Sequence, residues 1–320
     1  ESLQYMWWER KSVRSIAKAL NRSPSSISRE LQRNFPSEYQ RYSPHLAQAR
    51  ASEYRKHRGR TDRLKNQTIR DYVTLHLKKR WSPEQISGRI FKDIGQHISH
   101  EAIYQYIYHQ VYRKGYGFLK PGREDLIPYL RRRRKRRVPK GLRPCQKLPK
   151  FQGISIEQRP SIVNDRLRFG DWEGDSVESV NHKPGINTLV ERKSGLVFIT
   201  KLKNKTAVST TAAVNHRFTN LPVDLKHTLT LDNGPENSGW RSIESLTGTR
   251  CYLAHPYCSG ERGTNENTNG LIRDYYPKKT DFSMIPEEDI QFVEYELNTR
   301  PRKRLNYLTP LEVINVALEG

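Results

Sequence analysis

Three acidic residues of the sequence lie in local settings that can bring them together around a metal ion. Asp175 lies in a strand-like segment at 172–177, Asp232 follows the strand-like run 228–231, and Glu266 lies near the start of a helical segment. Two strands and a helix can converge at one corner of a fold, where hard carboxylate oxygens suit Mg²⁺ or Mn²⁺. Two such ions, about 3.5–4 Å apart, can activate the attacking oxygen and stabilise the leaving oxygen of a phosphodiester. We therefore predict a site with two metal ions, in which Asp175 and Asp232 are the central ligands and Glu266 is the third.

The residues alone leave competing assignments open. Asp171 and Glu173 would share a strand face with Asp175, so any of the three acids fits the first ligand position. An Asp-Asn-Gly sequence such as the one at 232–234 is by itself more typical of a turn. An acid in the first turn of a helix, such as Glu266, is favoured by the helix dipole. His227, His255 and Cys258 are alternative metal ligands, although core or loop roles are more typical of such isolated residues.

Composition indicates a polyanionic partner. The chain has 320 residues and a formal net charge of +23, and Lys and Arg displace condensed counterions from nucleic-acid phosphates. A basic protein with merely solvated charges is the alternative. The length suggests two or three domains.

The same composition bears on the compartment. Cysteines occur only at 145, 251 and 258, and an odd count argues against a disulfide framework and favours a reducing, cytoplasmic setting. Neither a membrane span nor a signal-like stretch is evident, so no membrane partner is expected. The chain begins with Glu1 rather than Met, which leaves room for upstream residues.

Residues 1–42 are predicted to form a first helix-turn-helix module. Apolar residues at 13, 16, 17 and 20 follow one helix face. Ser23 and Pro24 then provide a cap and a first helical residue for a second helix, which buries Ile27 and Leu31. A second helix placed in the major groove would point its polar side chains at phosphates and base edges. The residues predicted to contact DNA are Ser25, Ser26, Ser28, Arg29, Gln32 and Arg33. A plain helical hairpin with a polar face is the alternative.

A second helix-turn-helix module is predicted at 67–116, after a basic helical linker at 43–66. Ser82, Pro83 and Gln85 combine an N-cap, a proline at the first helical position and a capping-box residue. Ser99 can cap a further helix that buries Ile103 and Ile107. Its outward residues predicted to contact DNA include His100 and Gln105.

Residues 117–160 are predicted to form a basic linker or arm. An unbroken run of cations is followed by prolines and a glycine, which is typical of a mobile segment. We expect the arm to order on DNA, with contacts from Arg131, Arg132, Arg133, Arg134, Lys135, Arg136 and Arg137. A solvated linker without specific contacts is the alternative.

Residues 161–300 are predicted to form an α/β domain, with a basic segment and a helix at 301–320. Strands are expected at 171–180, 187–193, 196–202, 227–232 and 250–254. Helices are expected at 206–218, 240–246, 264–275, 287–299 and 310–318, which together give a layered α/β architecture. Beside Glu266, Asn265, Asn269 and Arg273 are predicted to contact DNA. Orientation of the carboxylate and helix capping are alternative roles for the two asparagines.

The motifs of the chain resemble those of bacterial insertion-sequence transposases of family thirty (IS-thirty). The resemblance covers most of the chain. It rests on the two helix-turn-helix segments at 16–34 and 81–104, on Gly170-Asp171-Trp172-Glu173-Gly174-Asp175, on Leu231-Asp232-Asn233-Gly234, on the long block 261–270, and on Asn298-Thr299-Arg300-Pro301-Arg302-Lys303 with Thr309-Pro310. One departure is Gly260, where the family usually carries Trp, which affects the loop before Glu266.

The resemblance implies a multidomain protein in which all-α helix-turn-helix modules precede an RNase H-like α/β domain with a mixed sheet. It also implies an acid triad of the DDE type with Asp175, not Asp171, as first ligand. Recognition of terminal inverted repeats, with insertion through a DNA intermediate whose ends are joined, follows from the same resemblance.

These features predict a transposase that cleaves double-stranded DNA at element ends and transfers the 3′-hydroxyl to target DNA. Two ends must be held together, so a homodimer is expected, acting in the bacterial cytoplasm at the nucleoid. A non-catalytic, sequence-specific DNA-binding regulator that retains the fold is the main alternative. A general RNase H-like nuclease is another, and it predicts cleavage without specificity for the ends.

Overall fold

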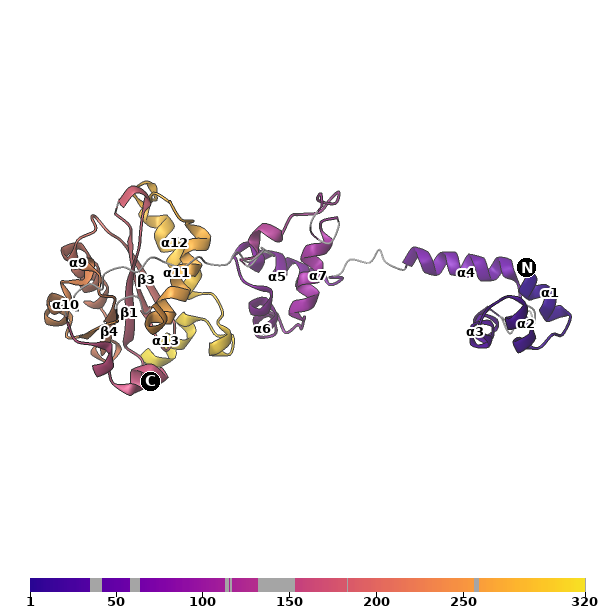
Figure 1. The fold of residues 1–320 in the computed structure, drawn as a ribbon, viewed down its shortest axis with the longest axis horizontal. Coiled ribbons are helices and arrows are strands. Elements are labelled where there is room, and N and C mark those ends of the chain that lie inside the picture. Colours follow the sequence, from indigo (N-terminus) through magenta and orange to yellow (C-terminus); the bar gives the residue numbers. More distant parts are fainter. Residues whose placement is uncertain are drawn as a thin grey trace. The chain divides into compact units, whose positions relative to one another are not determined.

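A computed structural model describes residues 1–34, 42–57, 64–112, 115, 117–131, 153–182, 184–255 and 259–319. The chain divides into two units, Glu1–Lys65 and Asn66–Gly320 (Figure 1). The described part of the first unit is helical, whereas the second unit combines helices with a mixed sheet. No helix in the described ranges has both the length and the apolar character needed to cross a membrane.

The described part of the first unit contains the helices α1 (Ser2–Trp8), α2 (Val13–Ala19), α3 (Pro24–Asn34) and α4 (Pro44–His57). The side chain of Ser12 accepts a hydrogen bond from the backbone of Ser15 and so caps α2. Ile16 is buried against α3 in a small apolar core. All six α3 residues predicted to contact DNA are exposed, which leaves that face free for a partner. The helix-turn-helix prediction is thereby confirmed, and α4 forms within the predicted linker.

A second group of helices begins the second unit: α5 (Gln67–Lys78), α6 (Pro83–Ile94) and α7 (His100–His109). Ser82 and Gln85 form the predicted capping box at the start of α6. Gly95 ends α6 with a φ of 65°, a left-handed conformation that glycine adopts at low cost. Ser99 caps α7, as predicted. Capping and apolar spacing therefore place these helices, whose buried side chains include Ile86, Ile90, Ile103 and Ile107.

A five-stranded mixed sheet forms the centre of the α/β domain. Its strands are β1 (Asp171–Val177), β2 (Ile186–Glu191), β3 (Val197–Lys201), β4 (Thr228–Leu231) and β5 (Arg250–Leu253). The order is β3-β2-β1-β4-β5; β1, β2 and β3 pair antiparallel, whereas β4 and β5 run parallel to β1. This is the RNase H-like topology, and all five strands lie where they are predicted. β1 ends earlier than predicted, at Val177.

Helices cover both faces of the sheet (Figure 1). On one face α9 (Ala207–Phe218) and α10 (Trp240–Thr247) pack over a core that includes Trp172, Phe218 and Leu229. On the other, α11 (Gly263–Tyr275) and α12 (Glu287–Asn298) pack over a core that includes Ile186 and Ile272. The short α8 (Ser161–Asp165) precedes β1, and α13 (Pro310–Glu319) ends the described chain. β1 therefore lies in the middle of the sheet with a helical layer on each side.

Gly170 sets the close approach of β1 to β4. Its φ is 87°, and a Cβ added there would lie 2.8 Å from the backbone carbon of Leu225. The carbonyl of Gly170 accepts hydrogen bonds from the backbone N–H groups of His227 and Thr228, at 2.8 and 3.2 Å. A residue with a side chain would clash with this backbone and strain the turn. This glycine therefore helps to align the two strands that carry Asp175 and Asp232.

Candidate active site at the ends of the central strands

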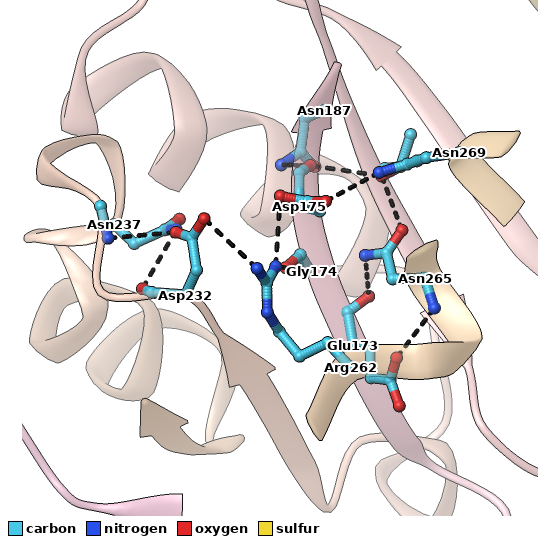
Figure 2. Close-up of polar contacts among 11 residues, drawn as sticks. Glu173, Gly174, Asp175, Asn187, Asp232, Asn237, Arg262, Asn265 and Asn269 are labelled. Atoms are coloured by element: carbon cyan, nitrogen blue, oxygen red, sulfur yellow. Dashed lines mark hydrogen bonds and ion pairs between the residues drawn. The ribbon is translucent and has the colours of Figure 1, made fainter. Parts of the chain in front are cut away.

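Two of the predicted acids meet at the carboxyl ends of β1 and β4. Asp175 lies on β1 and Asp232 directly follows β4; the two strands are parallel neighbours in the sheet. The guanidinium of Arg262 lies between them, with Nη1 3.2 Å from Oδ1 of Asp175 and Nη2 3.5 Å from Oδ2 of Asp232 (Figure 2). One oxygen of each carboxylate therefore faces a shared cation.

The outer oxygens of both acids are held by hydrogen bonds. Asn269 donates from Nδ2 to Oδ2 of Asp175 at 2.8 Å. The backbone N–H of Gly234 donates to Oδ1 of Asp232 at 3.1 Å, and the Asn237 side chain donates to the same oxygen. These bonds fix the rotation of each carboxylate, so the inner oxygens stay aimed at the space that the guanidinium fills.

The electrostatics of the acid pair reflect burial and mutual repulsion. Burial raises the pKa of the Asp175 carboxyl; the positive charge of Arg262 lowers it, and the nearby charge of Asp232 raises it. Two carboxylates this close disfavour each other's ionised form unless a cation lies with them. The pair is therefore a place where positive charge is bound strongly.

Helix α11 is attached to β1 and β2 through two asparagines. The fully buried Asn265 donates its backbone N–H to Glu173 at 2.8 Å, and its side-chain amide donates to the Glu173 carbonyl. The hydroxyl of Thr188, which pairs with Asp175 across the sheet, lies 3.1 Å from the side-chain oxygens of both Asn265 and Asn269. In this conformation the two asparagines contact Glu173, Thr188 and Asp175. Their contact with DNA, and the alternative of orienting the Glu266 carboxylate, stay predictions.

The other two acids of β1 form ion pairs with arginines other than Arg262. Arg168 donates to both oxygens of the buried Asp171, at 2.9 and 3.0 Å. Glu173 is fully buried and forms an ion pair with Arg192. Both carboxylates are thus compensated by cations that hold the domain together. Asp175 is the β1 acid that shares a cation with the acid after β4.

Glu266 is placed differently from the other two predicted ligands. It lies in the first turn of α11, one turn after Arg262, and its side chain is exposed. Within the described ranges, no group of three His, Cys, Asp or Glu side chains is arranged to hold a metal ion. The structure therefore brings Asp175 and Asp232 together, and the role of Glu266 as third ligand stays a prediction.

The other predicted DNA contacts are distributed over the chain. His100 and Gln105 are exposed on α7. Arg131 forms an ion pair with Asp274 at 3.1 Å, and the rest of the basic run at 132–137 lies outside the described residues. Arg273 donates to the backbone carbonyls of Pro277 and Glu178, at 3.3 and 2.9 Å.

Some site residues escape sequence reasoning. Arg262 is recognisable as a positive charge near Glu266, but no local pattern indicates that it joins the two aspartates. Asn237 lies in the loop after Asp232, where an amide five residues on is a weak signal. Thr188 lies within a uniformly buried strand, and only the pairing of β2 with β1 brings it to Asp175.

Helix-turn-helix modules joined to an RNase H-like domain, with paired acids at the ends of its central strands, define a protein of the transposase and integrase class. A family model for a helix-turn-helix domain matches residues 3–34. The chain is 37% identical over 301 residues to the transposase for insertion sequence element IS4351 of Bacteroides fragilis, covering 94% of this chain and 89% of the relative. It is also 37% identical over 316 residues to the transposase InsI for insertion sequence element IS30A of Escherichia coli K12, covering 95% and 78%. The chain belongs to the insertion-sequence transposases of the IS30 family.

Two solved structures are also similar to about half of the chain. One is the catalytic core domain of BIV integrase, with a TM-score of 0.37, 22% identity, and coverage of 47% of this chain and 96% of that chain. The other is a chain of the simian T-cell lymphotropic virus intasome in complex with PP2A regulatory subunit B56 gamma, with a TM-score of 0.39, 18% identity, and coverage of 53% and 59%.

Proposed function

We propose that this chain is the transposase of an insertion sequence. It binds the terminal inverted repeats of the element, cleaves a strand at each end to release a 3′-hydroxyl, and transfers that hydroxyl to target DNA. Membership of the family supports the proposal at the level of the whole chain. The observation that carries it is the convergence of Asp175 and Asp232 on one cationic group, at the strand ends of an RNase H-like sheet.

The acid pair fits divalent metal ions. The inner oxygens of Asp175 and Asp232 face a guanidinium, so a cation already satisfies this donor set. We propose that these oxygens hold Mg²⁺ or Mn²⁺, two ions in each site, with Glu266 as the third ligand. When bound, such ions supply Lewis-acid stabilisation of the attacking and leaving oxygens of the phosphodiester.

The side chains around the pair orient it. Asn269 and Asn237 each hold one outer carboxylate oxygen, which restricts the acids to a single rotamer. Ligands held in place in this way need little reorganisation when the charge of the reacting phosphate develops. Arg262 offsets one of the two negative charges of the pair before a metal ion binds and is then free to contact a DNA phosphate.

The helical modules supply end recognition. We propose that the exposed residues of α3 between Ser25 and Arg33 enter a major groove and that His100 and Gln105 of α7 form a second reading surface; their exposure supports this role. Transposition joins two ends, so we propose that a homodimer holds one end on each subunit. The substrate is double-stranded DNA, so we propose that the protein acts in the bacterial cytoplasm at the nucleoid.

Strand cleavage on labelled DNA tests the proposal. The substrate carries the inverted repeats that flank the gene, with Mg²⁺ or Mn²⁺ present, and wild type is compared with Asp232→Asn. Asp224→Asn is the matched control, because this exposed acid lies away from the acid pair. We expect wild type and the control to cut and join at the ends, while Asp232→Asn binds the DNA and does neither.

Three other outcomes would each contradict a different part of the proposal. If all three proteins bind the repeats and none cuts with any divalent metal ion, the non-catalytic regulator replaces the transposase. If wild type cuts DNA regardless of the repeats, the protein is a general nuclease. If Asp232→Asn cuts as fast as wild type, the assignment of the acids is wrong.

A further inference from the structure

We propose that a partly open, arginine-lined cavity in the second unit is a binding site for a phosphate group. The cavity has a volume of about 460 Å³ and lies between the start of α6, one face of α11 and the segment after α12. Its lining contains six cationic side chains and a single acid, Glu84, all within the described residues. The cations are Arg80, Arg131, Arg300, Arg302, Lys303 and Arg304. Nothing in the acid-pair site explains this concentration of charge.

Arg300 provides the clearest sign of a missing anion. Its side chain is 2% exposed, and Nε donates to Oε1 of Gln85 at 2.9 Å. Its Nη1 has no hydrogen-bond partner among the described residues. A buried guanidinium N–H without an acceptor carries a large desolvation penalty, so native structures nearly always satisfy it. An anion in the cavity would accept this bond.

The surrounding arginines add repulsion that an anion would relieve. Burial lowers the pKa of Arg300 to about 10, and the charges of Arg131 and Arg80 lower it as well. Burial also lowers the pKa of Arg302 to about 9, with Arg300 among the further causes. Asp274 offsets part of this charge, because it pairs with Arg131 at 3.1 Å and its carbonyl accepts from Arg80 at 2.6 Å.

The walls of the cavity are fixed by long-range contacts. The Gln85 side chain caps α6 and also donates to the carbonyl of Pro301 at 2.7 Å. Arg131 lies against α11, where a Cβ at Gly270 would be 2.7 Å from its Nη2. The absence of a side chain at Gly270 therefore makes room for this cation.

Phosphate is the anion that this chemistry suits. Planar guanidinium groups bind phosphate oxygens in pairs, and several of them converge here. Asn267 and Leu271 of α11 line the cavity, whereas Asn269 of the same helix holds Asp175. A DNA strand that passes the acid pair would thus have α11 as a common wall with the cavity. The choice of a DNA backbone phosphate over free phosphate as ligand rests on the proposed function.

Thermal unfolding with inorganic phosphate tests the site. The full chain is titrated with phosphate at constant ionic strength, without divalent metal ions, and the unfolding midpoint is followed by circular dichroism. A ligand that binds only the native state raises the midpoint with its concentration. For wild type we expect a saturable rise of the unfolding midpoint. For Arg300→Gln we expect phosphate to bind at least about tenfold more weakly than to wild type, because a charge-assisted bond is lost. Arg241→Gln, which removes an exposed cation elsewhere, should behave as wild type.

A second variant covers the case in which Arg300→Gln does not fold. Arg131→Gln changes a side chain that is 32% exposed, so its effect on folding is smaller, and it should also weaken phosphate binding. An equal phosphate-dependent rise in wild type, Arg300→Gln and Arg131→Gln would overturn the proposal and leave an adventitious ion only. The proposal would also be overturned if phosphate did not raise the unfolding midpoint of wild type.

Competition with DNA identifies the source of the phosphate. If the site holds a backbone phosphate, saturating inorganic phosphate at fixed ionic strength weakens duplex binding by wild type and not by Arg300→Gln. If it holds free phosphate, duplex binding is unchanged while the thermal shift persists. Failure of the proposed function is separable, since Asp232→Asn should keep the full phosphate shift. Absence of cleavage by wild type, or wild-type cleavage by Asp232→Asn, with that shift intact in both proteins rejects only the catalytic proposal.

Discussion

Replacing Arg262 with glutamine should strengthen metal binding by the free protein. Its guanidinium lies 3.2 Å from Asp175 and 3.5 Å from Asp232, and it is 14% exposed. A metal ion at the inner oxygens must break both contacts. A hydrogen bond to a charged group contributes about 1.5–3 kcal/mol. Both bonds are long, so we take a total of about 1.4–3 kcal/mol, which corresponds to about a 10- to 150-fold gain in affinity.

The assay is a Mn²⁺ titration without DNA, in which electron paramagnetic resonance reports the free ion. Arg273→Gln is the matched control, because this arginine lies on α11, the helix that Arg262 precedes, and its described bonds go to backbone carbonyls rather than to the acids. Asp232→Asn should lose most of the binding. Equal or weaker Mn²⁺ affinity in Arg262→Gln would refute the reasoning, since the guanidinium would then not compete for the metal position.

Three further predictions concern orientation and stability. Asn269→Ala frees one oxygen of the first acid and should slow single-turnover cleavage about 10- to 100-fold, whereas Ala at the exposed Asn220 should not; equal rates would contradict the orienting role. Glu312→Gln removes a paired bond to Arg89, at 2.6 and 2.8 Å, and should lower the free energy of unfolding by about 1–2 kcal/mol at pH 7. The pKa of Glu312 is held well below its usual range, mainly by Arg89, so this contribution is complete above the unfolded carboxyl pKa of about 4.3 and is lost on further acidification. Urea unfolding at pH 7 and pH 3.5 should therefore show a difference between wild type and variant that shrinks in acid, and a constant difference would argue against the ion pair. Leu229→Ala leaves a cavity at a fully buried position and should cost about 2–5 kcal/mol in the same assay; a loss below about 1 kcal/mol would mean that the core collapses around it.

Local signals in the sequence determined the elements and their order. Ser82 with Gln85, and Ser99, mark helix starts because a capping bond involves only residues within one turn. The five strands follow from runs of apolar and β-branched residues, since burial of such runs needs no knowledge of the partner strand. Asp232 could be placed at a strand end for the same reason. Helix α5 is not among the predicted elements, although Asn66 caps it.

The tertiary structure alone decided which charged groups meet. Three acidic residues lie on β1, and they differ in the arginine with which each carboxylate pairs: Asp171, Glu173 and Asp175. Arg192, which pairs with Glu173, reaches it through the pairing of β1 with β2. Arg262 reaches Asp175 because α11 packs against that strand pair, 87 positions away in the chain. Such contacts depend on how elements pack, and no local preference encodes them.

The same distinction applies to the arginine-lined cavity. The sequence shows a basic cluster at 300–304, which alone is equally compatible with solvated surface. In the folded chain Arg300, which contacts Gln85 215 residues away, is buried, and its Nη1 has no acceptor among the described residues. A charge in water needs no partner, whereas a buried one does. The sequence therefore determined that the protein is basic and where its acids lie, and the fold determined which of those charges are available for a ligand.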